Sequence, residues 1–473
     1  MSQRRRRENP IPFPLLLTTL IGLALSAATG AQQATFIEYT PAGAEITITD
    51  LGVLPGGTFS SGLAINNQPV IVGLANDSNF ELERPFWDAN TGAIIGFADN
   101  FNPASTAIPE HINDGREMAG TEMYGDNVYQ GIYWNSIGQA FVLPPMAGVD
   151  PFYGSNHTKA HGINNLGQIV GTGKEGEPDF LTHPVLWPDK DTEAIDLGFL
   201  GQGEPFNSGI AYGINDLSHV VGNGTVGTLV LGFLWRDGQL TNLGTLGGQI
   251  VSEAYAVSNG GVIVGRANIF PVLWTYDVSN PSSTPTITQL PMPSGFFSAT
   301  PKAVNDAGDV AGYAGSPNID AHAILWRDGL AIDLGVWPGG HYSVATGINE
   351  LGQISGTGTV AGDNLDHALM WTFDDGTSNS TPIVTLQAKP TRIYVLESVS
   401  VKVSFTDPDN GPWSYTVAWG DGSSTSGITS TEGKISGINP HIYTQAGKFG
   451  INVSVTDAEE ATGVSNTVMI KVR

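Results

Sequence analysis

Four aspartates near the C-terminus are of the residue type best suited to bind a hard cation. They are Asp407, Asp409, Asp421 and Asp457, and carboxylate oxygens are ligands that Ca²⁺ prefers. Aspartate is also a residue that tight turns select. The chain has no Asp-x-Asp-x-Asp-Gly loop with a downstream Glu. The four aspartates are therefore a candidate calcium site with turn formation as the alternative, and we expect no other cofactor.

The histidines are spaced as parts of a repeat rather than as a metal site. His183, His322 and His367 each lie four residues before a tryptophan of the repeat described below, and His111 and His161 lie near Ile-Asn turns. Side chains that occur once per repeat lie in different structural units, so they cannot meet around one metal ion unless they all face a common axis. We therefore predict structural or surface roles for these histidines.

No established catalytic motif is present. The sequence lacks Gly-x-Ser-x-Gly, His-Glu-x-x-His and a Gly-Lys-Ser/Thr phosphate loop. Paired carboxylates for glycoside cleavage cannot be recognised, because their pairing is three-dimensional. The sequence identifies no catalytic residue, and we expect binding rather than catalysis.

Glycine pairs provide the candidate ligand loops. Gly247-Gly248 and Gly339-Gly340 follow short strand-like segments, as Gly56-Gly57 does. One interpretation is that they let the chain cross between structural units. The alternative is that these loops line one face of the protein and build a binding site there.

Composition points to a β protein that is held together without disulfides. The 473 residues include 61 Gly, 29 Pro and no Cys, and the formal net charge is −25. The length predicts two domains or a repeat array. The negative charge argues against a nucleic-acid partner, since nucleic-acid binding rewards Lys and Arg.

The N-terminus has the features of an export signal. Four arginines, Arg4 to Arg7, precede an apolar stretch from Leu15 to Ala28, and small residues follow. We predict a signal peptide over residues 1–31, with an uncleaved anchor as the alternative. Cleavage would delete four Arg and one Glu and change the net charge from −25 to −28. No second segment is long and apolar enough to span a bilayer, and export without cysteine suggests a secreted or periplasmic bacterial protein.

Two elements alternate strictly along the chain and define seven repeats. One is an Ile-Asn turn element, clear at Ile214-Asn215-Asp216 and degraded at Val257-Ser258-Asn259. The other is a tryptophan that ends a short apolar strand. The repeat tryptophans are Trp87, Trp134, Trp187, Trp235, Trp274, Trp326 and Trp371.

Each repeat is of the right size for a small antiparallel sheet. Asn, Asp and Gly form the turn after the first strand, and Asp-Gly pairs at Asp237-Gly238 and Asp328-Gly329 indicate a hairpin after the tryptophan. Four strands per unit predict a β-propeller of about seven blades. The strand that closes the ring is either Ile48 to Gly52 or Pro382 to Leu386.

The repeat resembles the HAF repeat of bacterial extracellular proteins. The matching residues are the Gly-Ile-Asn-Asp segments, the His-Ala-x-x-Trp segments ending at Trp326 and Trp371, and the Leu-Gly-Thr-Leu-Gly-Gly run from Leu243 to Gly248. Copies one, two and five depart from it, with Glu83 at the histidine position of copy one. The resemblance implies export and brings no defined activity.

After Asp375 the repeat stops and a short polar linker follows. The later residues resemble a PKD domain, through the Trp419 to Gly422 segment, His441-Ile442-Tyr443 and Val455-Thr456-Asp457. The resemblance implies an Ig-like β-sandwich that serves as an accessory module. The predicted domains are a propeller over residues 32–380, a linker or closing strand over 381–386, and the PKD-like domain over 387–473.

Together these observations predict an all-β, monomeric, secreted binding or adhesion protein with a glycan or protein ligand. The alternatives are a secreted polysaccharide lyase or glycoside hydrolase that uses the propeller axis, and a purely structural surface component.

Overall fold

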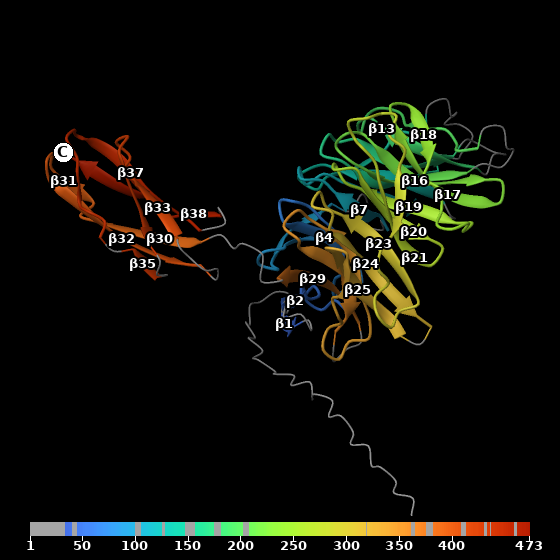
Figure 1. The fold of residues 1–473 in the computed structure, drawn as a ribbon, viewed down its shortest axis with the longest axis horizontal. Helices are drawn as coiled ribbons and strands as arrows, with labels where there is room; N and C mark the ends of the chain where they lie inside the picture. The colour runs from blue at the N-terminus through green and yellow to red at the C-terminus, as the bar shows by residue number, and fades with distance from the viewer. Residues whose placement is uncertain are drawn as a thin grey trace, which may run out of the picture. The chain divides into compact units, whose positions relative to one another are not determined.

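The computed structural model describes residues 34–39, 45–99, 106–124, 128–146, 157–174, 181–201, 208–317, 319–360, 365–374, 382–407, 413–429, 433–435, 437–457 and 461–473. These residues form β-strands and no α-helix, so none of them forms a helix that could cross a membrane (Figure 1). The all-β prediction is confirmed. The chain divides into two compact units, Met1–Phe373 and Asp374–Arg473. The predicted signal segment, residues 1–31, lies outside the described residues.

Consecutive copies of the repeat each form one antiparallel sheet, with the four strands ordered as they follow in the chain. The first three sheets contain β3 (Ser60–Ile65), β4 (Val70–Asn76), β5 (Leu82–Asp88) and β6 (Ile94–Ala98); β7 (Ile108–Ile112), β8 (Met118–Tyr124), β9 (Val128–Trp134) and β10 (Ala140–Val142); and β11 (Thr158–Ile163), β12 (Ile169–Lys174), β13 (Thr182–Trp187) and β14 (Ile195–Asp196). The next three contain β15 (Gly209–Ile214), β16 (Val220–Val226), β17 (Leu229–Arg236) and β18 (Gln239–Asn242); β19 (Ser252–Val257), β20 (Val262–Ala267), β21 (Phe270–Thr275) and β22 (Thr286–Gln289); and β23 (Ser298–Val304), β24 (Val310–Ser316), β25 (Ile319–Arg327) and β26 (Leu330–Asp333).

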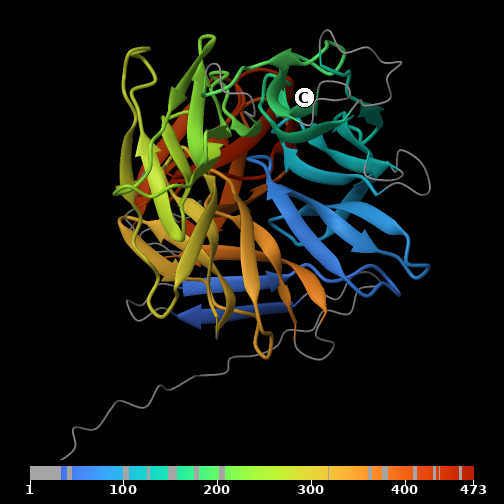
Figure 2. The same ribbon diagram turned by 90° about the vertical axis from the view of Figure 1, so that its right-hand side faces the viewer.

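The last sheet of this unit joins the two ends of its chain segment. It contains β27 (Ser343–Ile348), β28 (Ile354–Thr359), β29 (Asp366–Asp374), β2 (Glu45–Asp50) and β1 (Ala34–Tyr39). Strand β2 pairs with β29 in the place of a fourth strand, and the Leu51 N–H donates to the Ala368 carbonyl at 2.9 Å (Figure 2). Ile46 and Ile48 of β2 are buried in the core of this sheet because their side chains alternate toward it.

The prediction that the strand from Pro382 to Leu386 occupies this place is wrong. Residues Ile383–Lys389 form β30, which pairs with β32 (Ser398–Thr406) of the C-terminal unit. Val384, Leu386 and Ala388 point into the core of that unit. A domain boundary at residue 387 is therefore too late, because the first strand of the C-terminal unit already begins at Ile383.

The repeat tryptophans hold neighbouring sheets together. All but the half-buried Trp235 are buried. Trp134 packs against Val72 and Phe86 of the preceding sheet. The indole N–H of Trp134 donates to the Asp99 carbonyl at 3.1 Å, and that of Trp274 donates to the Leu243 carbonyl at 2.8 Å. Each acceptor lies at the end of the previous sheet, so these two tryptophans supply both apolar area and a polar link between sheets. The buried indole N–H groups of Trp87 and Trp371 have no hydrogen-bond partner among the described residues.

The C-terminal unit contains two sheets around one core. The strands other than β30 and β32 are β31 (Arg392–Ile393), β33 (Trp413–Ala418), β34 (Ser424–Thr429), β35 (Gly433–Ile435), β36 (His441–Ile442), β37 (Gly447–Thr456), β38 (Thr462–Val464) and β39 (Val468–Val472). One sheet has the order β30-β32-β35 and the other β31-β39-β37-β33-β34. Phe405, Trp419 and Tyr443 are buried between them, and the Tyr443 hydroxyl donates to the Trp419 carbonyl at 2.8 Å.

Candidate functional site

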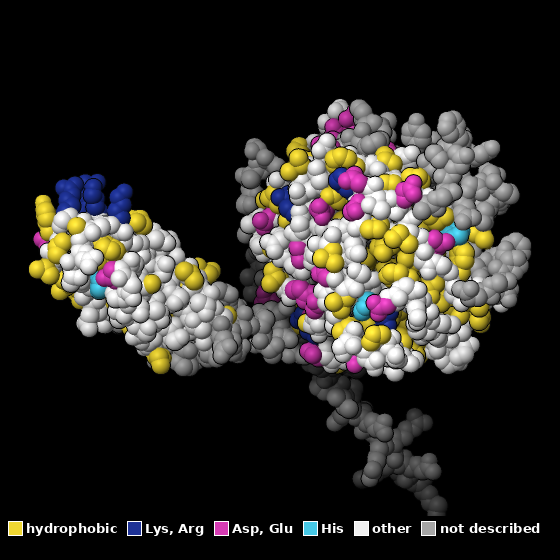
Figure 3. Space-filling view, turned by 90° about the horizontal axis from the view of Figure 1, so that it is seen from above, with side chains coloured by type: hydrophobic (Ala, Val, Ile, Leu, Met, Phe, Trp, Pro, Cys, Tyr) yellow, Lys and Arg dark blue, Asp and Glu magenta, His cyan; other side chains and the backbone are white. Residues whose placement is uncertain are grey.

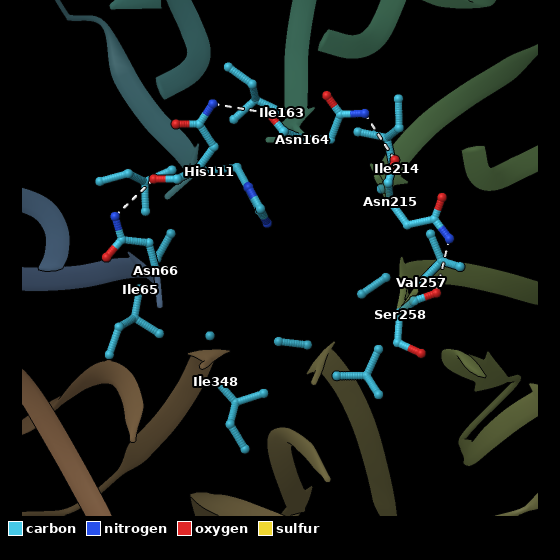
Figure 4. Close-up of a pocket in the computed structure, with 18 of the residues that line it drawn as sticks. Ile65, Asn66, His111, Ile163, Asn164, Ile214, Asn215, Val257, Ser258 and Ile348 are labelled. Carbon is cyan, nitrogen blue, oxygen red and sulfur yellow. Dashed lines mark hydrogen bonds between the residues drawn. The ribbon is translucent and has the colours of Figure 1, made fainter. Parts of the chain in front are cut away.

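The first strands of seven successive sheets end around one cavity. The cavity has a volume of about 200 Å³ and is lined by the C-terminal ends of β3, β7, β11, β15, β19, β23 and β27, together with the turns that follow them (Figure 4). The same segment of every repeat lines this cavity. Comparing the seven copies therefore distinguishes positions that keep one type of residue from positions where the residue varies.

The asparagine of the Ile-Asn element forms the framework. In copy three, Asn164 accepts the backbone N–H groups of Leu166 and Gln168 through Oδ1, which closes its own turn. Its Nδ2 donates to the Asn215 carbonyl of the next sheet at 2.9 Å. The same donation to the next sheet is made by Asn66, Asn113, Asn164, Asn215, Asn305 and Asn349.

Two features of this asparagine series stand out. Asn349 of the last sheet donates to the carbonyl of Asn66 in the first sheet at 3.1 Å, although 283 positions separate them. Ser258 of copy five has a shorter side chain, whose Oγ accepts only from Val262 of its own turn among the hydrogen bonds of the described residues. Figure 4 shows Ser258 beside the cavity, together with Asn66, Asn164 and Asn215 of the same series.

A second series lies one residue further along. The residue after each asparagine is always Asn, Asp or Glu: Asn67, Asp114, Asn165, Asp216, Asn259, Asp306 and Glu350. Each donates its backbone N–H to the side-chain oxygen of the next member, and Glu350 donates to Asn67 at 2.9 Å. Four carboxylates therefore surround the mouth of the cavity. Burial raises the pKa of Glu350, and although the Asp306 N–H lowers it, nearby carboxylates raise it further.

A bulge in every first strand re-aims one variable side chain, and five of these seven side chains line the cavity. The register shifts once in each of these strands, for example between Ala160 and Gly162 and between Ala211 and Gly213. A bulge leaves one residue unpaired and re-aims its side chain. The residues at this position are Leu63, Glu110, His161, Tyr212, Tyr255, Lys302 and Thr346.

Five of these residues form a continuous polar and aromatic arc. Glu110 Oε2 lies 2.6 Å from His161 Nδ1. The His161 ring lies 5.7 Å from that of Tyr212, which is 5.5 Å from the ring of Tyr255. The Lys302 ammonium lies 4.6 Å from the centre of the Tyr255 ring. The arc crosses five sheets, whereas the remaining two copies contribute Leu63 and Thr346.

Burial shifts the pKa values of three members of the arc. Burial, followed by the charge of Glu253, raises the pKa of Tyr212. Burial, followed by a hydrogen bond to Glu253 at 2.8 Å, raises the pKa of Tyr255. Desolvation by the surrounding protein, followed by the charge of Arg266, lowers the pKa of Lys302, whose side chain still meets water inside the cavity. The tyrosines are therefore neutral hydrogen-bonding groups near neutral pH.

His111 is an exception to the repeat. Two residues before the asparagine, the other copies have only Gly or Ala, and Figure 4 shows the imidazole of His111 at the cavity. Desolvation lowers the pKa of His111, against a smaller opposing effect of the Ile163 carbonyl. Water reaches the side chain, but protein encloses it on most sides. His111 thus narrows a cavity that small residues keep open elsewhere.

The glycine loops predicted as ligand loops lie elsewhere. Gly247 and Gly248 precede β19, and Gly339 and Gly340 precede β27, so they lie at the opposite ends of these strands from the cavity. Gly340 allows a close approach, because a Cβ there would lie 2.1 Å from the Thr359 carbonyl oxygen. This geometry favours the interpretation that the loops let the chain cross between sheets.

The repeat histidines pair with aspartates of the neighbouring strand. His183 Nδ1 lies 2.8 Å from Asp196, and His322 lies 2.9 Å from Asp333. His367 of β29 lies 2.9 Å from Asp50 of β2, so the same kind of pair recurs between these two adjacent strands. These pairs are spread over three sheets and do not converge.

The candidate calcium residues have other partners where they are described. Asp407 accepts the Trp413 indole N–H at 2.6 Å, and Asp457 accepts the Ala461 N–H at 3.0 Å. Burial would raise the pKa of Asp421, but hydrogen bonds from Ser423 and His441 outweigh it and lower the pKa to about 2. Asp409 lies outside the described residues. Within the described ranges, no group of three or more His, Asp or Glu side chains is placed to hold a metal ion.

The comparisons with known proteins assign the C-terminal unit. The family model of the PKD domain matches residues 379–472. Residues 379–472 are a PKD domain. A solved PKD domain of an M14-like peptidase from Thermoplasmatales archaeon SCGC AB-540-F20 matches with 20% identity over 20% of this chain and 98% of its own, with a TM-score of 0.18. The predicted resemblance of this region is therefore confirmed, together with its Ig-like fold.

A second solved structure matches a longer stretch. It comes from a structural and mechanistic study of two prolyl endopeptidases and matches with 11% identity and a TM-score of 0.46. The match covers 75% of this chain and 56% of that one, and at this similarity it assigns no activity. No curated protein matches the sequence.

The variable arc and the acidic series were not predicted from the sequence, although both had a signal there. The residue after each asparagine is polar in all copies, and the residue three positions before it varies between Leu, Glu, His, Tyr, Lys and Thr while its neighbours are regular. Aligning the seven copies and asking which position varies would have found it.

Proposed function

We propose that the protein is an extracellular glycan-binding module, in which residues 45–373 form a closed seven-bladed β-propeller of HAF-type repeats. Closure is supported by contacts between the last and first sheets. The Thr346 hydroxyl donates to the Gly62 carbonyl at 3.0 Å, and Asn349 donates to the Asn66 carbonyl at 3.1 Å. The same asparagine bond joins most consecutive sheets, so the last junction shares this bond with most of the internal ones.

The extracellular assignment rests on the C-terminal domain. PKD domains are typical of extracellular proteins, where they serve as binding or structural modules. The basic and apolar N-terminal segment of the sequence supports export. A formal net charge of −25 keeps such a protein soluble and argues against polyanionic partners for the chain as a whole.

The observation that carries the proposed function is the arc at the bulge position. A repeat framework needs no particular side chain there, yet the chain places Glu110, Tyr212, Tyr255 and Lys302 in the cavity, with His161 in contact with Glu110. Aromatic rings with polar tips and flanking hydrogen-bonding groups match a sugar, which has apolar ring faces and hydroxyl groups. The acidic mouth disfavours a uronate or phosphate at this place and favours a neutral or amino sugar.

The test is capture of the chain on an array of neutral, amino and acidic glycans, comparing Tyr212→Ala and Tyr255→Ala with Ile250→Ala. Ile250 is exposed in the Gly247-Gly248 loop and is the control for the alternative site. Each tyrosine variant should weaken capture at least about fivefold, since one aromatic contact contributes about 1 kcal/mol beyond its buried area. Unchanged melting temperatures would show that the variants fold.

Three outcomes would refute or redirect the proposal. Absence of capture by the parent chain refutes glycan binding, and loss of capture only in Ile250→Ala assigns the site to the glycine loops. Release of shorter oligosaccharides, abolished by His161→Ala, would favour the second candidate, a polysaccharide-cleaving enzyme. That candidate is supported by the Glu110–His161 contact of 2.6 Å, because a carboxylate that orients an imidazole is suited to acid–base chemistry.

A further inference from the structure

The PKD domain has a compact row of cations on one sheet. Arg392 of β31 is the register partner of Lys471 in β39, and Lys471 is the partner of Lys448 in β37. Register partners on adjacent strands point to the same face about 4.8 Å apart. All three side chains are exposed, while their neighbours Ile393, Ile470 and Val472 are buried. Arg473, two residues after Lys471 and also exposed, extends the row.

The row is a local exception in an acidic chain. It holds four of the seven Lys and Arg residues that follow residue 381, whereas the whole chain has a formal charge of −25. Figure 3 shows Lys and Arg side chains gathered at one end of this domain. Within the described ranges, none of the four cations forms an ion pair with a carboxylate. Four like charges held side by side without counterions favour an anionic partner.

We propose that the row Arg392, Lys448, Lys471 and Arg473 binds an acidic polysaccharide through its repeated carboxylates. Cations on three neighbouring strands form a flat series with a spacing comparable to one sugar unit, so successive uronates meet successive cations. Arg392 lies at one end of the row, and its guanidinium can donate two parallel hydrogen bonds to one carboxylate. Tyr394, two residues beyond Arg392, is 62% exposed and offers an aromatic face to a sugar ring.

The surface suits a polysaccharide better than other polyanions. A nucleic-acid duplex requires a broad basic surface, and the remaining acidic chain would repel it. A membrane surface would also meet that negative charge over a wide area. A single flexible strand with one charge per sugar can instead lie along the row and avoid the acidic regions. This site is separate from the cavity of the N-terminal unit, so it does not depend on the proposed glycan site there.

The experiment measures binding of the full chain to polygalacturonate, with dextran as a neutral probe, single-stranded DNA, and vesicles that contain phosphatidylserine. The test variant is Arg392→Glu with Lys471→Glu. The control is Lys402→Glu with Lys434→Glu, which makes the same charge change on exposed lysines of the other sheet, β30-β32-β35. Melting temperatures confirm that both variants fold.

The expected result is binding to polygalacturonate at low salt that weakens about tenfold in the test variant and little in the control. Binding should also disappear near 1 M salt, where the screening length falls to about 3 Å. Equal losses in both variants would show an effect of net charge alone and overturn the proposal. No binding to polygalacturonate, or binding only to DNA or to vesicles, would overturn it as well.

Discussion

The junction between the last and first sheets can be tested with two matched substitutions, Asn349→Ser and Asn164→Ser. Both asparagines are buried and make the same four hydrogen bonds. Asn164 does so within the array, with Leu166, Gln168 and Asn215. Asn349 does so at the junction, with Leu351, Gln353 and Asn66. Serine is a natural probe, because Ser258 occupies the same position in copy five.

The magnitude follows from the bonds that serine loses. Ser258 Oγ accepts one backbone N–H of its own turn, from Val262 at 3.2 Å. A serine at either asparagine position should keep this one bond and lose three others: the two Nδ2 donations and one acceptance. At about 1 kcal/mol for each net hydrogen bond, the free energy of unfolding should fall by about 3 kcal/mol. With a urea m-value of about 3 kcal/mol/M, the midpoint falls by about 1 M.

The assay is urea unfolding followed by tryptophan fluorescence, because eight of the ten tryptophans precede residue 374. In a closed ring, Asn349→Ser and Asn164→Ser should lower the midpoint equally, since both junctions must hold for the unit to stay folded. A loss about 1 kcal/mol smaller for Asn349→Ser than for Asn164→Ser would refute closure, because, of the bonds that Asn349 loses, only the one to the Asn66 carbonyl crosses the junction.

Two further predictions concern the closing strand and the cavity. Ile48→Ala should destabilise the N-terminal unit by about 3 kcal/mol, as expected for a buried large-to-small change. Leu386→Ala should instead destabilise the PKD domain. Calorimetry in which each substitution lowers the melting temperature of the other unit would contradict the observed strand pairing. Enclosure lowers the pKa of His111 in the folded protein, so the unfolded chain binds a proton at this imidazole more readily. The folded state is therefore destabilised as the pH falls below 6.5, the ordinary pKa of histidine. His111→Ala should therefore show a smaller drop in melting temperature between about pH 7 and about pH 5 than the parent chain, and an identical drop would exclude this residue as the cause.

Much of the N-terminal unit was determined by the sequence, because its repeated contacts are local. The turn at Asn215-Asp216 and the hairpin at Asp237-Gly238 each depend on a few neighbouring residues. The strand pairs on either side of them appear as expected. The tryptophans were also predictable as buried residues, since a large apolar side chain at a fixed repeat position must meet the neighbouring unit.

The PKD domain was predictable for a different reason. The Trp419 to Gly422 segment and His441-Ile442-Tyr443 carry a family signature that the family model confirms over residues 379–472. The beginning of the domain was not predictable, because an alternating strand such as Ile383–Lys389 fits either of two sheets equally well. Only the burial of Val384 and Leu386 in one core distinguishes them.

The candidate sites were decided by the tertiary structure. The pairing of Asp50 with His367 joins positions 317 apart, and no local pattern specifies a contact at that separation. The bulges direct Tyr212 and Lys302 to the cavity, and a one-residue shift would send both side chains to the other face. The basic row likewise exists only because three strands distant in sequence align Arg392, Lys448 and Lys471. The sequence determines the repeating unit through local turns and apolar periodicity, whereas the chemistry at its centre depends on how the units meet.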